Sequence, residues 1–538
     1  MRLGLRPLTS VAVLGALLSL VPVQGQRLPS VTQAAGPYPP MSLLARLQDP
    51  QGPPGMEGGW IARTARAILQ DEPLTGTMPV AIILALFADS PEPHISTDQI
   101  QQAMFDGPSA FGTVSEFYSE ASGGRFTVTG QTTPWVRTSL TMAEVVGSEY
   151  GLGGDAQTGT YLLEAVAAAD FLIDFTQFDS DGPDGVPNSG DDDGIADALA
   201  IQFIELAASC GGPSIWPHRS SLSGWTGGQP YESNDIGFDG TPILLGAYTT
   251  QGATDCGGVE AQNATTIAHE LGHVLGLPDL YDRSQGLEPE RRRWVVGCWS
   301  LMAAGSWGCG TEDREGWVRP THFGPWEKDL LGWLSEVVFV EPGLDGSFTL
   351  EPVQTSGRVL KIPLEPDAPN PEYYLVEYRT QEGFDADLPS SGVLIYHIDP
   401  KIGGNRPCDT CPQLYRVGLV EADGNDSLRR TFLQGGNRGE PGDAWGFPGP
   451  GSLTSNTTPS SRLNSGEPSA VTVYSISIED GVAHLNLSSR AIPTVSLLQA
   501  FLQTTSPPLT GDEESYLDSR GNGNGQFDVG DLRAYLRR

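Results

Sequence analysis

Hydrophobic and polar positions along the chain follow two different periods, and these periods predict its elements. A strongly apolar run at residues 78–89 predicts a buried strand, and residues 125–138 alternate in the manner of a second strand. Helical spacing is present at residues 114–121 and 161–173, and residues 198–206 predict a further strand. Because strands and helices interleave, we expect an α/β (α+β) layer in this part of the chain.

The C-terminal part of the chain has a different pattern. From residue 341 onward, short segments such as 373–378 and 392–398 alternate with a period of two, and turn residues separate them. This pattern predicts a β-sandwich-like domain at residues 341–490. The remaining residues, 491–538, are expected to form a small helical module.

The N-terminal residues are typical of an exported protein. Arginines precede an apolar run from Val11 to Val21, which is too short for a transmembrane helix and is followed by small residues that offer a cleavage site. We therefore interpret residues 1–25 as a signal peptide and expect a secreted, extracellular protein. Residues 26–75, rich in Pro, Gly and Gln, are interpreted as a pro-segment or linker, and residues 76–340 as the first folded domain.

The charge of the chain excludes some classes of partner. It has 66 acidic and 31 basic side chains, for a formal net charge of -35. Binding of nucleic acid needs clustered Lys and Arg, so a nucleic-acid partner is not expected. Docking on an anionic membrane is disfavoured for the same reason, and no later apolar stretch is long enough for membrane insertion.

The six cysteines fit an oxidising destination, where an even number suggests disulfides. Of the fifteen possible connectivities, we expect the one that joins neighbours in the sequence: Cys210 with Cys256, Cys298 with Cys309, and Cys408 with Cys411. A zinc ribbon at the last pair is disfavoured, because no second CxxC and no paired histidine lies nearby.

One motif carries the chemistry. His269 and His273 are four residues apart, so on a helix both imidazoles project from one face, as two ligands of a tetrahedral zinc would. Gly276 can take the positive φ that ends the helix and turns the chain back. Asp279 then arrives as a third, oxygen ligand, and Asp282 is the second choice for that role.

The residue between the histidines completes a catalytic set. Glu270 can reach a zinc-bound water without ligating the metal, and it would act as the general base for attack on a polarised carbonyl. A site that is only structural would close with four protein ligands and would have no use for this carboxylate.

The order HExxHxxGxxD, followed by Met302, resembles the metzincin metallopeptidases, and more narrowly the immune inhibitor A-like family of secreted bacterial peptidases. The resemblance extends over about residues 78–460 and is also carried by shorter blocks at residues 80–89, 115–122, 278–282, 331–333 and 392–399. It implies a metzincin-like zinc endopeptidase that acts on proteins or peptides, is made as a secreted precursor and is helped by calcium. Met302 would form the hydrophobic floor of its active site, although an ordinary core methionine would occupy the same place.

Two acidic segments predict calcium sites, because Ca²⁺ needs many oxygen ligands and sharp backbone turns. Aspartates interleaved with glycines crowd residues 174–197, and a solvated acidic loop is the alternative there. The candidate ligands in this loop are Asp179, Asp181, Asp184, Asp191, Asp193 and Asp197.

The second segment resembles half of a dockerin module. Read as an EF-hand-type loop, it places oxygen side chains at positions 3, 5, 9 and 12, namely Asn522, Asn524, Asp528 and Asp531. Position 1 is Arg520, for which Asp518 is a possible substitute, and position 12 is Asp where Glu is usual. The resemblance implies a weak cohesin-type or intramolecular partner.

Two rival functions remain open from the sequence. The first is a secreted calcium-dependent adhesion or carbohydrate-binding protein, in which the metal site is inactive or non-proteolytic. Glu270 together with a complete ligand set argues against it, because a binding module has no use for a general base. The second is a zinc hydrolase that acts on a carbonyl other than a peptide.

Overall fold

The structure is a computed structural model of the 538-residue chain. It describes residues 59–535, except for 287–288, 310–318, 342, 344, 366–367, 369, 406–413, 447–450, 490–493, 503–508, 510–513, 515–516 and 519–522. The predicted signal peptide lies outside the described residues, as do Cys408, Cys411 and Asn522.

A six-stranded, mostly parallel sheet forms the N-terminal layer, with the order β2-β1-β4-β8-β5 and β3 beside β1. Only β5 runs antiparallel to its neighbour, and it lies at one edge. The strands are β1 (Gly76–Leu86), β2 (Phe126–Thr132), β3 (Val136–Arg137), β4 (Ala198–Phe203), β5 (His218–Ser221) and β8 (Ala247–Gly252). A separate hairpin pairs β6 (Tyr231–Ile236) with β7 (Pro242–Leu245).

Strand β1 is buried on both faces of this sheet, which explains its unbroken apolar run. Val80 and Ile82 face a core that holds α5 (Val114–Ala121) and α8 (Thr265–Val274). Ala81 and Ile83 face the opposite core, which holds α6 (Met142–Val146) and α7 (Thr158–Ala169).

The predicted elements of this layer are confirmed, with two differences. The run at 125–138 forms two short strands, because Pro134 has no N–H to donate to a ladder. The helix predicted at 161–173 begins at Thr158 and ends at Ala169, since Asp170 and the residues after it leave the helix.

Two further sheets follow in the chain. The first has the order β14-β13-β12-β11-β9, and the second has the order β10-β17-β16-β15. The strands of the first are β9 (Glu336–Phe339), β11 (Arg358–Pro363), β12 (Tyr373–Arg379), β13 (Gly392–Ile398) and β14 (Val417–Leu419). Those of the second are β10 (Asp345–Leu350), β15 (Ser452–Leu453), β16 (Thr472–Glu479) and β17 (Val482–Ser488).

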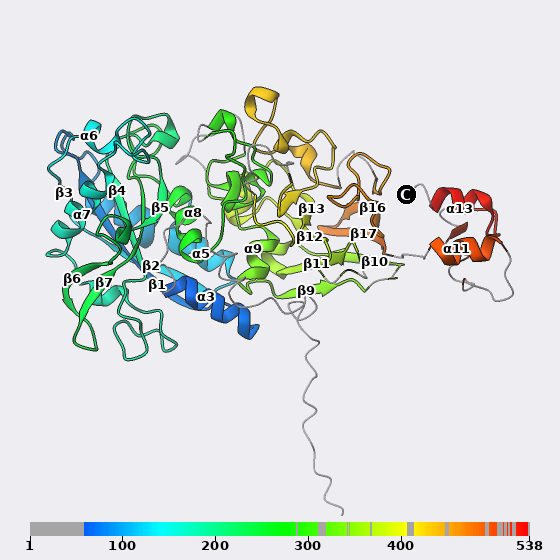
Figure 1. Ribbon diagram of the computed structural model, residues 1–538, viewed down its shortest axis with the longest axis horizontal. Coiled ribbons are helices and arrows are strands. Elements are labelled where there is room, and N and C mark those ends of the chain that lie inside the picture. The colour runs from blue at the N-terminus through cyan, green and yellow to red at the C-terminus, as the bar shows by residue number, and fades with distance from the viewer. Residues whose placement is uncertain are drawn as a thin grey trace, which may run out of the picture.

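The five-stranded sheet is the middle layer of the molecule (Figure 1). On one face, residues such as Val376 and Ile395 share a core with the four-stranded sheet. On the other face, residues such as Leu375, Leu394 and Tyr396 belong to the same core as α5 and α8. The hydrophobic core that supports α8 therefore includes side chains from strands beyond residue 340.

Helix α3 (Gly59–Gln70) lies in the range interpreted as a pro-segment or linker, and it packs on the main fold. Trp60 is 1% exposed, and its ring lies 5.1 Å from the ring of Phe126. Arg63 donates to the carbonyls of Gly182 (3.0 Å) and Thr75 (3.0 Å).

The described part of the C-terminal module contains α11 (Thr494–Phe501) and α13 (Val529–Tyr535), which appear at the right of Figure 1. Leu497, Leu517 and Leu532 pack together between them.

Within the described residues, the structure contains no helix that is both long enough and apolar enough to cross a membrane.

Two of the predicted disulfides are confirmed, Cys210–Cys256 and Cys298–Cys309.

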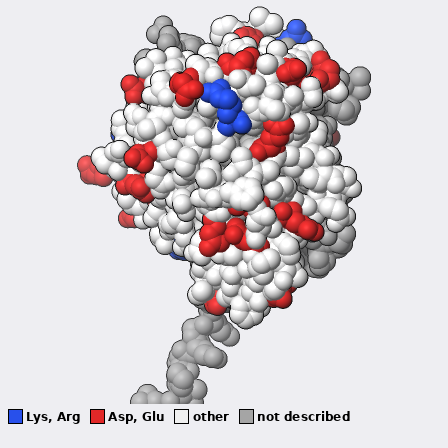
Figure 2. All heavy atoms as spheres, turned by 90° about the vertical axis from the view of Figure 1, so that its left-hand side faces the viewer, with Lys and Arg blue, Asp and Glu red and all other residues white. Residues whose placement is uncertain are grey.

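Figure 2 shows acidic side chains scattered over the face of the α/β layer, with few Lys or Arg among them. This distribution agrees with the formal charge of -35.

Candidate metal centre

The HExxH segment lies on α8, which is held against the sheet by its apolar face. Ile267, Ala268 and Leu271 are fully buried, and the Tyr118 hydroxyl donates to the carbonyl of Ala268 (2.7 Å). The helix ends where Gly276 adopts a φ of 88°, a left-handed conformation that favours glycine. This turn returns the chain toward the helix, and Asp279 reaches the two histidines.

The side chains of His269 and His273 are oriented by backbone carbonyls. Nδ1 of His269 lies 2.9 Å from the oxygen of Leu301, and Nδ1 of His273 lies 2.7 Å from the oxygen of Leu277. A carbonyl only accepts, so each Nδ1 donates a hydrogen to it, and this orients each Nε2 toward Asp279, as it would be oriented toward a metal.

Both Nε2 atoms converge on one oxygen of Asp279. The distance from Oδ1 is 3.2 Å to His269 and 3.4 Å to His273. Burial raises the pKa of Asp279, but the charge of His273 and the hydrogen bonds from both histidines outweigh it and hold the pKa well below its usual range. Two imidazoles and an ionised carboxylate around one point are a donor set that suits zinc.

Glu270 follows His269 on the helix and is 5% exposed. Its charge contributes to raising the pKa of Tyr281, a shift caused mainly by burial and by Asp279. The ring of Tyr281 is stacked on His269 with 6.4 Å between centroids. The carboxylate of Glu270 is therefore near Tyr281, whose ring stacks on a member of the donor set.

Met302 lies directly beneath the helix and is fully buried. A Cβ at Gly272 would come within 2.6 Å of the Met302 sulfur, so the absence of a side chain at Gly272 allows this contact. The backbone of the same turn ties two parts of the site together, since Leu301 accepts from His269 (2.9 Å) and Met302 accepts from the N–H of Leu280 (2.8 Å).

Asp282, the second choice for the third ligand, forms contacts with other residues and not with the histidines. It is fully buried, and Oδ2 lies 2.9 Å from Nη1 of Arg293 and 3.0 Å from the hydroxyl of Tyr415. The structure thus brings Asp279, and not Asp282, to the histidines.

The sequence reasoning missed an aromatic cage beside the site. The guanidinium of Arg292 lies 4.8 Å from the Trp216 ring, 4.7 Å from Tyr281, 5.6 Å from Trp294 and 5.5 Å from Trp307. Such contacts are favourable cation–π interactions. The only signal was the density of Arg and Trp at residues 291–307, which does not reveal which rings meet.

Two other histidines of this layer, His218 and His322, are held by protein groups. His218, on β5, contacts the carbonyl of Trp216 (2.7 Å) and the hydroxyl of Tyr248 (3.2 Å). His322 is buried, and its Nε2 lies 2.8 Å from Glu120.

Three of the six candidate calcium ligands in the acidic loop come together. Carboxylate oxygens of Asp179, Asp181 and Asp197 lie within 4.8 Å of one another, and all three residues are buried. Burial, together with the charges of neighbouring aspartates such as Asp193, raises the pKa of Asp179 to about 7 and that of Asp181 to about 6. Three crowded, buried carboxylates of this kind are suited to a bound cation.

The remaining candidates in this loop lie farther out. Asp184 and Asp191 are exposed, and both accept hydrogen bonds from Ser189. Asp193 accepts from the N–H of Gly59 at 2.8 Å, which ties the start of α3 to the acidic loop.

The described part of the C-terminal loop is closed by its own side chains. Asn524 donates to Asp528 (2.8 Å), and Asp531 accepts from the N–H of Asp528 (2.7 Å). Asp518, proposed as a substitute for position 1, accepts from the N–H of Gly525 at 2.9 Å and so lies against the loop.

Comparison with known proteins finds similarity in the segment that contains this site. Residues 96–334 match the family model described as the immune inhibitor A peptidase M6 catalytic domain. This segment includes α8, Asp279 and Met302, and the match supports a metallopeptidase.

Two known proteins are similar in sequence to part of this chain. The pre-pro-metalloprotease PrtV of Vibrio cholerae serotype O1 (strain ATCC 39315 / El Tor Inaba N16961) is 30% identical over 239 residues, which are 42% of this chain and 24% of that protein. Immune inhibitor A of Bacillus thuringiensis subsp. alesti is 30% identical over 253 residues, 43% of this chain and 33% of that protein. The chain thus spans a quarter to a third of the length of these relatives.

Proposed function

We propose that this protein is a secreted zinc-dependent endopeptidase of the metzincin type. The observation that carries the proposal is the convergence of both Nε2 atoms on Asp279 Oδ1, at 3.2 and 3.4 Å, with each Nδ1 held by a carbonyl. His269, His273 and Asp279 would hold the metal. Bound zinc supplies Lewis-acid chemistry, which polarises a peptide carbonyl and lowers the pKa of a water.

Glu270 acts as the general base in this proposal. It accepts a proton from the attacking water and then delivers it to the amine of the leaving peptide. The segment Leu301–Gly305 positions the site, because Leu301 orients His269 and Met302 supports α8 at Gly272.

The edge strand β5 is the proposed binding surface for the substrate backbone. It is the last strand in the described order of its sheet, and it contacts α8. An extended peptide can add to such an edge through main-chain hydrogen bonds. The substrates would then be proteins or peptides in extended conformation, bound next to Glu270.

A bound calcium ion in the acidic loop is the second part of the proposal. Asp179, Asp181 and Asp197 support it by their proximity, and one buried oxygen each of Asp179 and Asp197 has no hydrogen-bond partner among the described residues. The export signal, the precursor form, the β-sandwich-like domain and a second calcium in the C-terminal loop belong to the same proposal, on the sequence patterns given above.

The test compares the wild type with Glu270→Gln and His273→Ala. We expect Glu270→Gln to retain one zinc per chain and to lose hydrolysis of casein by at least about 100-fold, the scale of a missing general base. His273→Ala should lose both zinc and activity. Wild-type activity should disappear with a chelator and return with zinc.

Two results would contradict the proposal. Full activity of Glu270→Gln would remove the assigned base. A chain that binds zinc and yet cleaves no protein, while it binds a glycan in the presence of calcium, would favour the adhesion or carbohydrate-binding alternative.

A further inference from the structure

A second cluster of carboxylates lies in the segment that follows β14. Oxygens of Glu421, Asp423 and Asp443 lie within 4.8 Å of one another, although the residues are up to 22 positions apart in the chain. Glu421 is 3% exposed and Asp443 is fully buried, while Asp423 is exposed at the rim. No pattern in the sequence pointed to this cluster, because Asp443 lies 20 positions after Asp423.

One oxygen of Asp443 points independently to a missing ligand. Its Oδ2 accepts from the indole of Trp299 (2.9 Å) and from the N–H of Glu440 (2.9 Å). Its Oδ1 is buried and has no hydrogen-bond partner in the described part of the chain. A buried carboxylate oxygen without a partner is unfavourable unless a donor or a cation meets it, because burial removes the hydration of an ionised group.

The electrostatics of the cluster agree with a missing cation. Burial, together with the charges of Glu421 and Glu440, raises the pKa of Asp443 to about 8. Burial also raises the pKa of Glu421 to about 7. Among the described ion pairs, none involves Glu421, Asp423 or Asp443.

Two neighbouring residues favour a site here: Gly442 lets the backbone approach Asp423 closely, and Glu440 adds carboxylate oxygens at the rim. Gly442 has no side chain, and a Cβ there would come within 2.4 Å of Asp423 Oδ2. Glu440 lies at the rim, held by the amides of Asn425 (2.8 Å) and Asn437 (2.9 Å). All of these candidate ligands are carboxylate oxygens in an irregular segment between strands, a set that suits Ca²⁺ better than the smaller and more strictly octahedral Mg²⁺.

We propose that Glu421, Asp423 and Asp443 bind a calcium ion that fixes the loop at residues 421–443 against the floor of the metal centre. The site is separate from the acidic loop at residues 179–197 and goes beyond the proposed peptidase activity. Its ligands come from the C-terminal half of the chain, while the segment it holds carries Met302.

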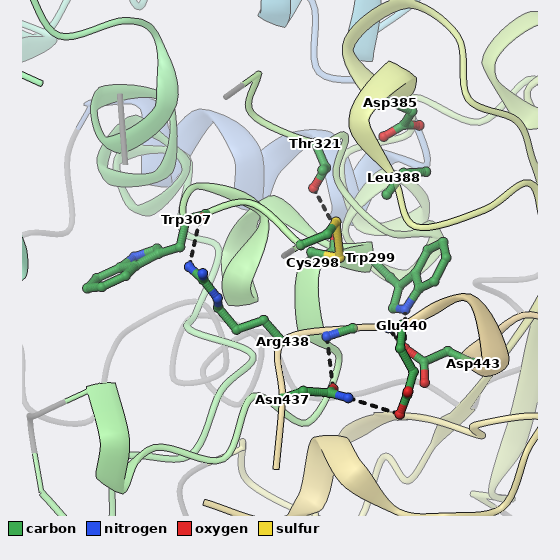
Figure 3. The surroundings of a disulfide bond; sticks show 12 residues. Cys298, Trp299, Trp307, Thr321, Asp385, Leu388, Asn437, Arg438, Glu440 and Asp443 are labelled. Carbon is green, nitrogen blue, oxygen red and sulfur yellow. Dashed lines mark hydrogen bonds between the residues drawn. A yellow bond between two sulfur atoms is a disulfide. The ribbon is translucent and has the colours of Figure 1, made fainter. Parts of the chain in front are cut away.

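The contacts of this loop explain its effect on the floor. Figure 3 shows the Trp299 indole directed at Asp443, with Arg438 reaching toward Trp307 beside the Cys298–Cys309 disulfide. Arg438 accepts from the N–H of Cys298 (2.6 Å) and donates to the carbonyl of Trp307 (2.7 Å). Two residues after Trp299, the carbonyl of Leu301 orients His269. The three carboxylates are therefore positioning residues.

The test measures calcium directly on the full chain after chelation, by calorimetry and by Tb³⁺ luminescence. Tb³⁺ replaces Ca²⁺ and is excited by a nearby indole, and here Trp299 is hydrogen-bonded to a proposed ligand. We compare the wild type with Asp423→Asn and Asp443→Asn, and with Asp181→Asn in the acidic loop as the matched control. Asp423→Asn is at the exposed rim, so it should fold whatever happens to Asp443→Asn.

We expect Asp423→Asn and Asp443→Asn to weaken one calcium site by at least about tenfold, since affinity follows the number of charged ligands. Both should lose part of the thermal stabilisation that calcium gives to the wild type. Asp181→Asn should retain this site, and Trp299→Phe should lower Tb³⁺ emission without removing Tb³⁺ binding.

Unchanged calcium affinity and stoichiometry in both Asp423→Asn and Asp443→Asn would overturn the proposal. Equal stabilisation of the wild type by Mg²⁺ would overturn the choice of calcium. Neither result depends on Glu270, so the measurement can be repeated in Glu270→Gln and is separate from the test of peptidase activity.

Discussion

At the scale of single residues, two aspartates three positions apart have different environments, and this separates their roles. Asp279 Oδ1 lies 3.2 Å from His269, whereas Asp282 is buried and lies 2.9 Å from Arg293. We expect Asp279→Asn to lose zinc while the fold survives. Asp282→Asn should retain zinc but lower the free energy of unfolding by about 3 kcal/mol, because it leaves a buried arginine without its charge partner.

Zinc content by atomic absorption and urea unfolding check this pair of variants. The opposite pattern, with zinc lost from Asp282→Asn and kept by Asp279→Asn, would exchange the two assignments.

His322 predicts a dependence of stability on pH. Burial lowers its pKa, and the charge of Lys328 adds to this, outweighing the opposite effects of Asp385 and Glu120. The unfolded chain keeps a histidine pKa of about 6.5, so below that pH the unfolded state binds a proton that the folded state does not. The free energy of unfolding is therefore highest, as far as His322 is concerned, above about pH 6.5, and it decreases as the pH falls below that value.

His322→Gln should remove that part of the acid sensitivity while it still donates to Glu120. We expect the wild type to lose more free energy of unfolding than His322→Gln between about pH 7 and pH 5, as measured by urea unfolding. Parallel pH profiles for the two proteins would show that His322 does not titrate in this way.

At the scale of elements, α3 is expected to be part of the stable fold. Trp60 is 1% exposed and packs on Phe126, and the N–H of Gly59 donates to Asp193 in the acidic loop. Trp60→Ala should lower the free energy of unfolding by about 3–5 kcal/mol, the range for large aromatic side chains in cores.

Leu69→Ala is the matched control, because Leu69 lies on the same helix and is 55% exposed. It should change the free energy of unfolding by less than about 0.5 kcal/mol. Equal effects of both variants in thermal unfolding would mean that α3 does not pack as described.

The sequence predicts an element well when the pattern that indicates it lies within one short segment. The apolar run of β1 and the spacing of His269 and His273 are local, and both segments form the element they predict. The position of α3, the Arg292 cage and the cluster around Asp443 depend on contacts between distant segments, so no period in the sequence reports them. The choice of Asp279 over Asp282 likewise depends on Arg293 and Tyr415, which pair with Asp282 only in the fold.

At the scale of the whole molecule, the five-stranded sheet contributes to the core that supports α8. We expect a chain that ends at residue 334 to lack a stable fold, because the apolar faces of α5 and α8 lose Leu375, Leu394 and Tyr396. A chain that ends at residue 489 should retain the near-ultraviolet circular dichroism and the cooperative thermal unfolding of the full chain. A cooperative transition in the shorter chain would show that the α/β layer is independent of the later sheets.

The shared core also sets an order of events in biosynthesis. Between Leu334, at the end of the matched catalytic segment, and Leu419, at the end of β14, lie about 85 residues. A ribosome adds about 5–20 residues per second, so about 4–17 seconds pass between synthesis of the last residue of the matched segment and that of the last strand of the middle layer. A nascent chain in that interval has its histidines but lacks the packing that positions them. If the chain is exported during translation, as the predicted signal peptide implies, it leaves the cytosol before the proposed metal centre is complete.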